Sequence, residues 1–577
     1  MQFSVGDDQY VLNVQKIGEA YLASKLKPFF EERKIAKVGS FWQHDYQFLR
    51  HLKIRADNLR DTYLNEHLLN KGKPDLWVKG RTSLQGLASR YLAVTLSKLE
   101  REAFINRQSY DFSTKEIEYA ANDVKYLVPI YKIQKDRLIH EGMNLIEEIE
   151  SACLPGLSSI TYNGIYLDKK IWLDILDKSY DGLRKAYDEL NQYFSNIGKF
   201  DLDLFGLPAI NYKSNLELLK ALKKVGYTNL ESTNDIELGE HLDPILYDLI
   251  RRFRVFSKSI STYGESFLDN INPVTGRIHP RVNQLGADSG RITESDPTLQ
   301  NIPIKDRPEF RTAFQAQYPK WLLNTTDYSG QELRIIAEMS DEDLWVDALN
   351  NDKPLHQVIG MKLFNLSEEK LNKKSAYYLI TKTLNFLVAY GGGVRKVQIA
   401  YRKLGINKTL DECKAILRNY YKLNSKVVTM IDNEIVRTLE NGYSTSLLGR
   451  KRFFNFPSYE ISINRDTGRL RFSPKSGNQD DAKTLSGMCR EAFNHRVQGT
   501  GADMSKIAVA GYDRELTRLK SSAFIVNTVH DELMDEFPET EKELSKIKTN
   551  KMLDAEAYIL KKIKPAVESH ISKIWEK

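Results

Sequence analysis

The spacing of apolar and polar residues predicts both strands and helices along this chain. Residues 524–529 form an apolar, β-branched run that breaks at 530–532 and resumes over 533–537. This pattern predicts two antiparallel strands joined by a polar bend. Residues 321–326 predict another strand, which ends at Asp327.

Longer stretches differ in their periodicity, which indicates several domains. Residues 170–265 are charged and carry apolar residues at helical spacing, and helices are expected again from about 341 to 440. Residues 272–303 are rich in Gly, Pro, Asn and Asp and predict loops. Residues 1–145 alternate short apolar runs with helical stretches, as in an α/β unit. The Pro, Gly and Ser residues of 152–168 place a domain boundary near residue 150, so the expected fold class is α/β and α+β in several domains.

Composition narrows the class of protein. With 577 residues, 41% hydrophobic and 28% charged, the chain predicts a soluble protein with more than one core. No apolar run is long enough to span a membrane, and the N-terminus lacks the form of a signal peptide. The three cysteines include no C-x-x-C pair, which argues against a disulfide framework and a cysteine-rich zinc site. We therefore expect an intracellular protein, and the net charge of +7 is a weak indication of a polyanionic partner.

Carboxylates at two predicted strand ends are candidates for cation binding. The bend at 530–532 is either a cation site or a polar turn that points into water, and the stretch alone favours neither. Ser329 and Glu332 predict a capping box for the helix after the other strand, a role that does not use Asp327. If the strands are neighbours, Asp327 and Asp531 lie together. Two carboxylates are the minimum for holding two Mg²⁺ in nucleotidyl transfer.

A predicted helix between these strands carries a face suited to a nucleoside triphosphate. Tyr378, Lys382, Phe386 and Tyr390 recur every four residues and share one face. A purely aromatic stripe would more often be core, but burying an unpaired ammonium is costly. The amine could contact phosphates while a ring stacks on a base. The glycines at 391–393 are expected to end the helix.

Together these stretches resemble the A-family DNA polymerases, the DNA polymerase I type. The resemblance rests on seven segments in the family's order: "TGRIHPRVNQLGADSGRITESDPTLQNIP", "DYSGQELR", "PLHQVIGMKLFN", "KTLNFLVAYG", "LLGRKRFF", "REAFNHRVQGTGAD" and "VHDE". It implies a 3′–5′ exonuclease-type domain of RNase H-like fold at residues 1–148 and a right-hand polymerase domain at 149–577. Within the latter, the expected parts are a thumb at about 170–275, a palm with an antiparallel sheet at about 276–340 and 441–577, and helical fingers at about 341–440.

The resemblance implies catalytic roles at individual positions. Asp327 and Asp531 would bind two Mg²⁺, for which Mn²⁺ could substitute, with the Tyr328 carbonyl as a further ligand. Glu532 would support them. Lys382 would contact the triphosphate and assist proton delivery to the leaving pyrophosphate.

The same resemblance implies residues that bind nucleotide and DNA. His356 would reach the phosphates, Phe386 would pack on the deoxyribose, and Tyr390 would hold the place that the templating base later takes. Glu332 would act as a gate against a ribose 2′-hydroxyl. The positions matching contacts to primer, template or minor groove are Arg291, Gln300, Asn301, Arg490, Asn494, Gln498 and His530.

Two features depart from the family pattern. Tyr378 occupies a position where the family usually has an Arg, so nucleotide affinity is weaker or another cation, such as Lys374, compensates. Residues 457–487 include extra sequence, with a predicted hairpin around 466–468, interpreted as a surface decoration.

The N-terminal region resembles the proofreading exonuclease less completely. "KVGSFWQHDYQFL" matches the second exonuclease motif with Asp45, although Phe41 stands where an Asn is usual, and "EYAANDVKYL" matches the third with Tyr119 and Asp123. The first motif, an Asp-x-Glu, does not precede Asp45. Either the domain is an inactive scaffold, another polypeptide completes it, or an N-terminal strand is missing. We expect that proofreading is absent in this chain.

The expected function is template-directed DNA synthesis from a primer 3′-hydroxyl, with primer-template DNA and dNTPs as partners and no membrane association. Further partners allowed by the resemblance are a processivity factor or a chain that completes the exonuclease. A single-subunit RNA polymerase and a non-catalytic DNA-binding relic are the alternatives; Glu332 argues against the first, and the intact Asp327, Asp531 and Lys382 argue against the second. Because no 5′-nuclease domain is recognised, the chain is more similar to bacteriophage members, which implies a cytoplasmic location, in the host if viral.

Overall fold

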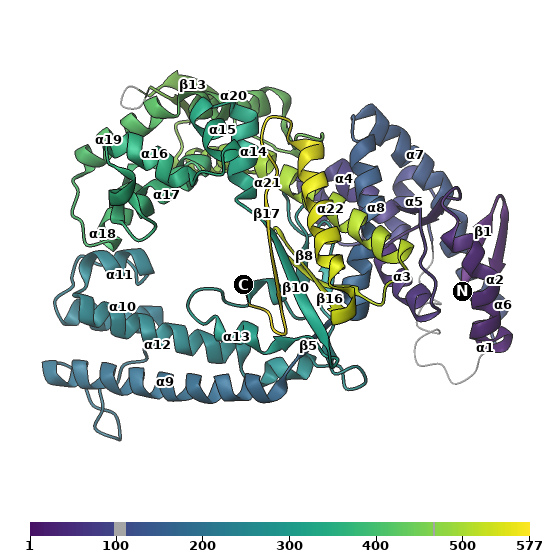
Figure 1. The fold of residues 1–577 in the computed structure, drawn as a ribbon, viewed down its shortest axis with the longest axis horizontal. Coiled ribbons are helices and arrows are strands. Elements are labelled where there is room, and N and C mark those ends of the chain that lie inside the picture. The colour runs from purple at the N-terminus through teal and green to yellow at the C-terminus, as the bar shows by residue number, and fades with distance from the viewer. Residues whose placement is uncertain (97–110, 465–467, 577) are drawn as a thin grey trace.

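The computed structural model describes residues 1–96, 111–464 and 468–576. Figure 1 shows an N-terminal α/β part, a central antiparallel sheet, and two helical arms that extend from the sheet on either side of an open space. The names thumb, fingers and palm are used below for the two arms and the sheet, and their boundaries stay predictions. The predicted α/β and α+β multidomain fold is confirmed.

The N-terminal part has little sheet for an α/β unit. Its two parallel strands, β3 and β4, form one small sheet, and β1 and β2 form a separate antiparallel hairpin that packs against α6. The elements are β1 (Gln2–Val5), β2 (Asp8–Val11), α1 (Val14–Ile17), α2 (Glu19–Glu31), β3 (Lys37–Gly39), α3 (Trp42–His51), β4 (Leu59–Asp61), α4 (Thr62–Asn70), α5 (Leu84–Leu92), α6 (Thr114–Lys125) and α7 (Leu127–His140).

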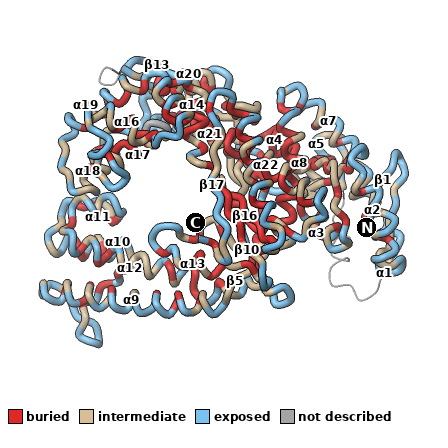
Figure 2. The backbone as a smooth tube through the Cα atoms, viewed as in Figure 1, coloured by how far each residue is buried: buried red, intermediate tan, exposed pale blue. Residues whose placement is uncertain are grey.

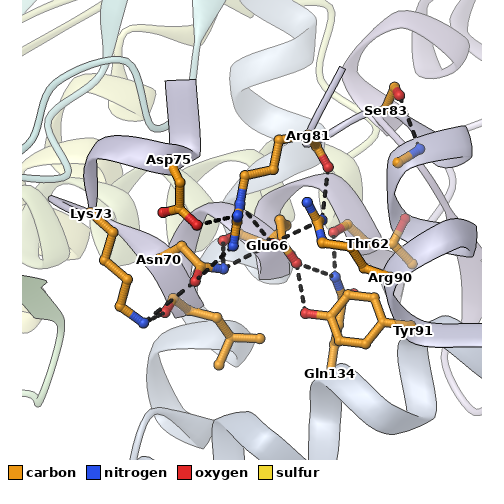
Figure 3. A network of polar contacts seen from close by, with 12 residues as sticks. Thr62, Glu66, Asn70, Lys73, Asp75, Arg81, Ser83, Arg90, Tyr91 and Gln134 are labelled. Atoms are coloured by element: carbon orange, nitrogen blue, oxygen red, sulfur yellow. Dashed lines mark hydrogen bonds and ion pairs between the residues drawn. The ribbon is translucent and has the colours of Figure 1, made fainter. Parts of the chain in front are cut away.

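A buried carboxylate joins several of these helices, as Figure 3 shows. Glu66 of α4 accepts hydrogen bonds from Tyr91 of α5 (2.7 Å) and Gln134 of α7 (3.3 Å). Arg90 lies 3.0 Å from its other oxygen, which also accepts a bond from Asn70. Since both carboxylate oxygens are committed, Glu66 is a structural residue here rather than a metal ligand.

The segment expected to contain a domain boundary is a continuous helix, α8 (Asn144–Asn163), with Pro155 inside it. The Pro, Gly and Ser content of residues 152–163 therefore does not mark a break in the helix. Gly156 explains part of that composition, because a Cβ there would lie 2.8 Å from Val509 Cγ1 of α21 (Gln479–Arg518). The small residue permits close helix packing, and the boundary near residue 150 stays a prediction that falls within α8.

The thumb consists of two long helices and two short ones. Helix α9 (Lys169–Ile197) packs along α12 (Pro244–Tyr263), and α10 (Asn215–Lys224) and α11 (Asp235–His241) lie between them in sequence. Leu190, Phe194, Leu222, Leu246 and Phe253 are buried in a core of their own. This arm confirms the helical prediction for 170–265.

The palm sheet has the strand order β15–β16–β10–β17, with antiparallel pairs throughout. Its strands are β10 (Trp321–Tyr328), β15 (Phe524–Val529), β16 (Glu532–Pro538) and β17 (Val567–Ser572). Helices α21 and α22 (Glu543–Ile559) pack together on one face, and the other face packs on an aromatic core that includes Trp172, Phe314 and Trp575. Figure 2 shows that buried residues concentrate around these strands and around α8. The predicted pair of strands with a bend is confirmed.

Short strands and turns connect the palm to the thumb, as predicted for 272–303. They are β5 (Ile165–Leu167), β6 (Arg277–Ile278), β7 (Arg281–Asn283), β8 (Thr293–Ser295), the one-turn helix α13 (Glu309–Thr312) and β9 (Phe314–Gln315). Farther along the chain, β11 (Tyr443–Thr445) pairs with β12 (Lys451–Phe453) and packs against α21.

The fingers are helical over the predicted region. Their helices are α15 (Asp343–Asn350), α16 (Leu355–Phe364), α17 (Ala376–Ala389), α18 (Val394–Lys403), α19 (Leu410–Leu423) and α20 (Ser425–Asn441). Helix α14 (Gln331–Ser340) precedes them and falls within the range expected for the palm. The predicted hairpin is present as β13 (Tyr459–Ile463) and β14 (Leu470–Pro474), although residues 465–467 of its turn lie outside the described residues. Arg469 pairs with Asp432 of α20, which fixes the hairpin to the fingers. Among the described helices of the whole chain, none has the length and apolar character to cross a membrane.

Candidate functional site

Three acidic residues lie at one end of the palm sheet. Asp327, the penultimate residue of β10, lies directly opposite Glu532, the first residue of β16, and Asp531 lies in the turn that precedes Glu532. His530 adopts a φ of 59° at that turn, which makes the tight bend. The sheet register therefore brings together the two candidate metal ligands that lie 204 positions apart in sequence (531 minus 327).

The electrostatics of this site favour a cation. Burial and then the nearby charge of Asp327 raise the pKa of Asp531 to about 7. Burial also raises the pKa of Glu532 to about 7, with Arg311 opposing the shift. An added positive charge would relieve the repulsion between the carboxylates.

Glu532 differs from the other two acids because its side chain has structural partners. Trp575 Nε1 donates a hydrogen bond of 3.1 Å to Glu532 Oε1, and Arg311 lies 4.0 Å from Oε2. Across the described residues, no three His, Cys, Asp or Glu side chains converge as ready metal ligands. Asp327 and Asp531 stay the candidate ligands, a number that suits Mg²⁺, which needs few protein oxygens.

Aromatic rings and one cation line a face of the fingers. The His356 ring lies 5.8 Å from that of Tyr378 and 5.9 Å from that of Phe386. Phe386 stacks on Tyr390 at 6.5 Å with an interplanar angle of 10°. Lys382 lies exposed on α17 between these rings in sequence. The structure confirms the shared face and the helix end before 391–393.

Two residues that the sequence did not single out orient His356. Tyr420 donates a 2.8 Å hydrogen bond to Asn385 Oδ1, so the Asn385 amide nitrogen faces His356 Nδ1 at 2.7 Å. Burial, and then the charge of Lys382, lower the pKa of His356 to about 4. A neutral imidazole whose Nδ1 accepts from Asn385 carries its proton on Nε2.

The predicted capping box is wrong. Helix α14 begins after Gly330, which has a φ of 69° and provides no side-chain cap. Glu332 instead accepts a hydrogen bond from Arg291, with 2.7 Å between Nη2 and Oε1. The local Ser-x-x-Glu motif could not predict this ion pair, because Arg291 lies 41 positions earlier in the sequence.

A buried quartet of charges, defined as Glu150, Arg450, Asp503 and Lys506, supports that loop. Lys506 Nζ lies 2.6 Å from Glu150 Oε1 and donates to the Gly290 carbonyl at 2.8 Å. Arg450 Nη2 lies 2.5 Å from Glu150 and 2.6 Å from Asp503. The quartet joins α8, α21 and the turn after β11, and it holds the backbone next to Arg291.

The expected DNA contacts lie on the connection between palm and thumb, at the turn between β15 and β16, and on α21. Gln300 donates to the Thr528 carbonyl (3.1 Å), and the Asn301 carbonyl accepts from Tyr263, so both are fixed between thumb and palm. The charges of Arg291 and Arg311 reach His530, and with burial, the larger cause, they lower its pKa. The expected positions on α21, spaced four residues apart along the helix, are Arg490, Asn494 and Gln498.

The exonuclease remnant is less complete than the palm site. Asp45 is exposed in the first turn of α3, whereas Tyr119 and Asp123 lie on α6 beside the β1–β2 hairpin. Among the described residues of the N-terminal region, no group of three or more His, Cys, Asp or Glu side chains is placed to hold a metal ion.

Comparison with known proteins places these observations in a family. The family model for DNA polymerase family A matches residues 181–577, and a 3′–5′ exonuclease model matches residues 1–139. DNA polymerase I of Pseudomonas aeruginosa is 28% identical over 540 residues, which cover 89% of this chain and 54% of the relative. DNA polymerase I of Borreliella burgdorferi is 28% identical over 548 residues, covering 92% and 55%. The chain thus spans about half the length of these curated relatives.

A solved structure agrees with the fold. The POL domain of Pol1 from M. smegmatis, in complex with DNA primer-template and dNTP, superposes with a TM-score of 0.75 at 21% identity, covering 97% of this chain and 88% of that one. The palm register and the family match over 181–577 lead to one conclusion: the chain belongs to DNA polymerase family A.

Proposed function

We propose that this chain catalyses template-directed DNA synthesis, in which a primer 3′-hydroxyl attacks the α-phosphate of a dNTP. The observation that carries the proposal is the register of β10 and β16, which brings Asp327 beside the turn that holds Asp531. The raised pKa of Asp531 supports a role in cation binding. The partners are primer-template DNA and dNTPs.

The two acids would hold two Mg²⁺, or Mn²⁺ as a substitute, with the Tyr328 carbonyl as a further ligand. Bound there, the ions would activate the 3′-hydroxyl and neutralise charge on the transferred phosphate. Glu532 keeps its hydrogen bond from Trp575 and its ion-pair contact with Arg311, and it contributes negative charge beside the ligands.

The fingers face would hold the incoming nucleotide. Lys382 offers an ammonium to the triphosphate and a proton to the leaving pyrophosphate, while His356 donates from Nε2 to a phosphate oxygen without carrying charge. Phe386 and Tyr390 present stacked rings to the sugar and base. Arg291 fixes Glu332, which then excludes a ribose 2′-hydroxyl.

Proofreading is proposed to be absent from this chain acting alone. Asp45 is exposed, and the described residues offer no cluster of acids in this region. A second polypeptide or a missing strand could complete the exonuclease, and a processivity factor is a further partner class. The cytoplasm is the proposed compartment.

A 5′-labelled primer on a longer template tests the proposal, with Mg²⁺ and with or without dNTPs. Extension with dNTPs and an intact primer without them is expected, and chelation of Mg²⁺ should stop extension. Absence of extension contradicts DNA synthesis, and primer shortening that Asp123→Ala abolishes contradicts the loss of proofreading. Replacing dNTPs with rNTPs should give little product unless Glu332→Ala is introduced, whereas efficient rNTP use by the unaltered chain would favour an RNA polymerase.

A further inference from the structure

The tips of the thumb and the fingers touch. Helix α11 of the thumb lies against α18 of the fingers, and Figure 1 shows the two helices meeting on the side of the open space that is remote from the palm. Lys403 Nζ lies 3.1 Å from Asp235 Oδ2, and Arg402 Nη1 lies 3.5 Å from Glu240 Oε2. The thumb provides both acids and the fingers provide both bases, so the surfaces are complementary in charge.

This contact closes a ring in the chain. The thumb reaches the palm through the packing of α9 on α13, which leads into β9. The fingers reach it through the packing of α20 on α21. With α11 against α18, palm, thumb and fingers form a continuous circuit. The ring surrounds the open space that strand β17 of the palm and helix α17 of the fingers border in Figure 1.

The ion pairs between α11 and α18 are weak enough to open and close. The side chains of Lys403 and Asp235 are 50% and 57% exposed, and ion pairs at such positions are weak and screened by salt. Asp235 is held in position by Tyr247 of α12, whose hydroxyl donates to it at 2.8 Å. The hydrogen bond from Tyr247 therefore orients the Asp235 carboxylate, while the exposed ion pair between Asp235 and Lys403 is easily broken.

We propose that the α11–α18 contact is a latch that encircles duplex DNA: it opens to admit primer-template and closes to retain it. The inference rests on the proposed function, because it takes primer-template as the occupant of the ring. The DNA is retained only if the protein encloses it completely, and the two ion pairs close the gap between thumb and fingers. Breaking them should shorten the stretch synthesised in one binding event.

A topological experiment tests the latch directly. Asp235→Cys/Lys403→Cys protein is loaded on primed circular DNA and joined with a short bismaleimide; the native Cys153, Cys413 and Cys489 are buried. The washes use about 1 M NaCl, where the Debye length is only about 3 Å. Joined protein should stay on the circle and leave when the circle is cut, whereas protein without the linker should wash off. Joined protein that washes off the intact circle overturns the latch.

A charge exchange tests the ion pairs themselves. With a heparin trap that permits one binding event, Asp235→Lys should shorten products by about 2- to 10-fold, and Asp235→Lys/Lys403→Asp should restore them. Asp181→Lys is the matched control, because Asp181 pairs with Arg184 on α9, away from the latch. Failure of the exchange to restore length, or equal shortening by the control, refutes the inference. If the unaltered chain extends no primer even without the trap, the proposed function fails, while retention on the circle still reports on the latch.

Discussion

Replacing Lys506 with Met should expose the energetics of the buried quartet. The Lys506 ammonium is fully buried, with contacts of 2.6 Å to Glu150 and 2.8 Å to the Gly290 carbonyl. Met fills a similar volume but carries no charge. Glu150 and Asp503 would then share Arg450 as their common cation within the quartet, and one negative charge would remain uncompensated.

The magnitude follows from removing one partner of a buried ion pair, which costs about 3–5 kcal/mol of unfolding free energy. Lys506→Met/Glu150→Gln should be more stable than Lys506→Met, although it carries one more substitution. In the unaltered chain Gln284 donates a hydrogen bond to Glu150 Oε2, and the amide oxygen of a Gln at position 150 can still accept it. The charge of Arg450 then balances that of Asp503. Groups in such contact usually couple by about 0.5–3 kcal/mol.

Urea unfolding followed by tryptophan fluorescence measures the order of midpoints, and amide exchange in α21 reports the same effect locally. The predicted order is Lys506→Met lowest, the double variant intermediate and the unaltered chain highest. A double variant that unfolds before Lys506→Met would refute the reasoning, because the losses would then add rather than compensate.

Three further predictions concern other sites. Gly501→Ala should lower the free energy of unfolding by about 1–3 kcal/mol, because a Cβ there would lie 2.4 Å from Gln331 Oε1. Gly487→Ala in the same helix should raise it by about 0.5–1 kcal/mol, because the nearest atom to a Cβ there is 3.9 Å away. Urea midpoints that shift in the same direction for both variants would contradict this prediction. Tyr378→Arg should lower the KM for dNTP by about 10-fold, since a charged hydrogen bond contributes about 1.5–3 kcal/mol, with Tyr378→Phe as the control; steady-state extension with an unchanged KM refutes it. Burial lowers the pKa of His495 to about 3, so the folded state holds the ring neutral and stability falls as pH drops below the unfolded pKa of about 6.5. The loss between pH 6.5 and 5 is about 2 kcal/mol from this group, and unfolding of His495→Gln should lack that part of the pH dependence; an identical dependence would be contrary evidence.

Patterns within one segment were sufficient for much of the fold. The strands around 530–532 and the helical arms follow from periodicity alone. Asp327 and Asp531 could be singled out because each interrupts or ends an apolar strand. The sheet register that joins them required only that the strands be neighbours.

Features that depend on distant contacts could not be foreseen. Helix α8 contains Pro155 and Gly156, which locally indicate a break, yet packing against Val509 stabilises the helix. Glu332 matches a capping box but pairs with Arg291 instead.

The orientation of His356 depends on the same kind of contact. Asn385 and Tyr420, which hold its ring, carry no signal in isolation, because their roles arise from the meeting of three helices.

The central claim is that Asp327 and Asp531 form the catalytic centre, and single-turnover nucleotide addition tests it most directly. Preformed complexes of protein and primer-template are mixed with dNTP and Mg²⁺, and addition of the first nucleotide is followed in time. The variants compared are Asp327→Asn, Asp531→Asn and a control, Asp343→Asn, which alters an exposed acid on the fingers. The account predicts that both palm variants bind DNA but lose addition by several orders of magnitude, while the control matches the unaltered chain. Addition at a near-normal rate by either palm variant would contradict the account.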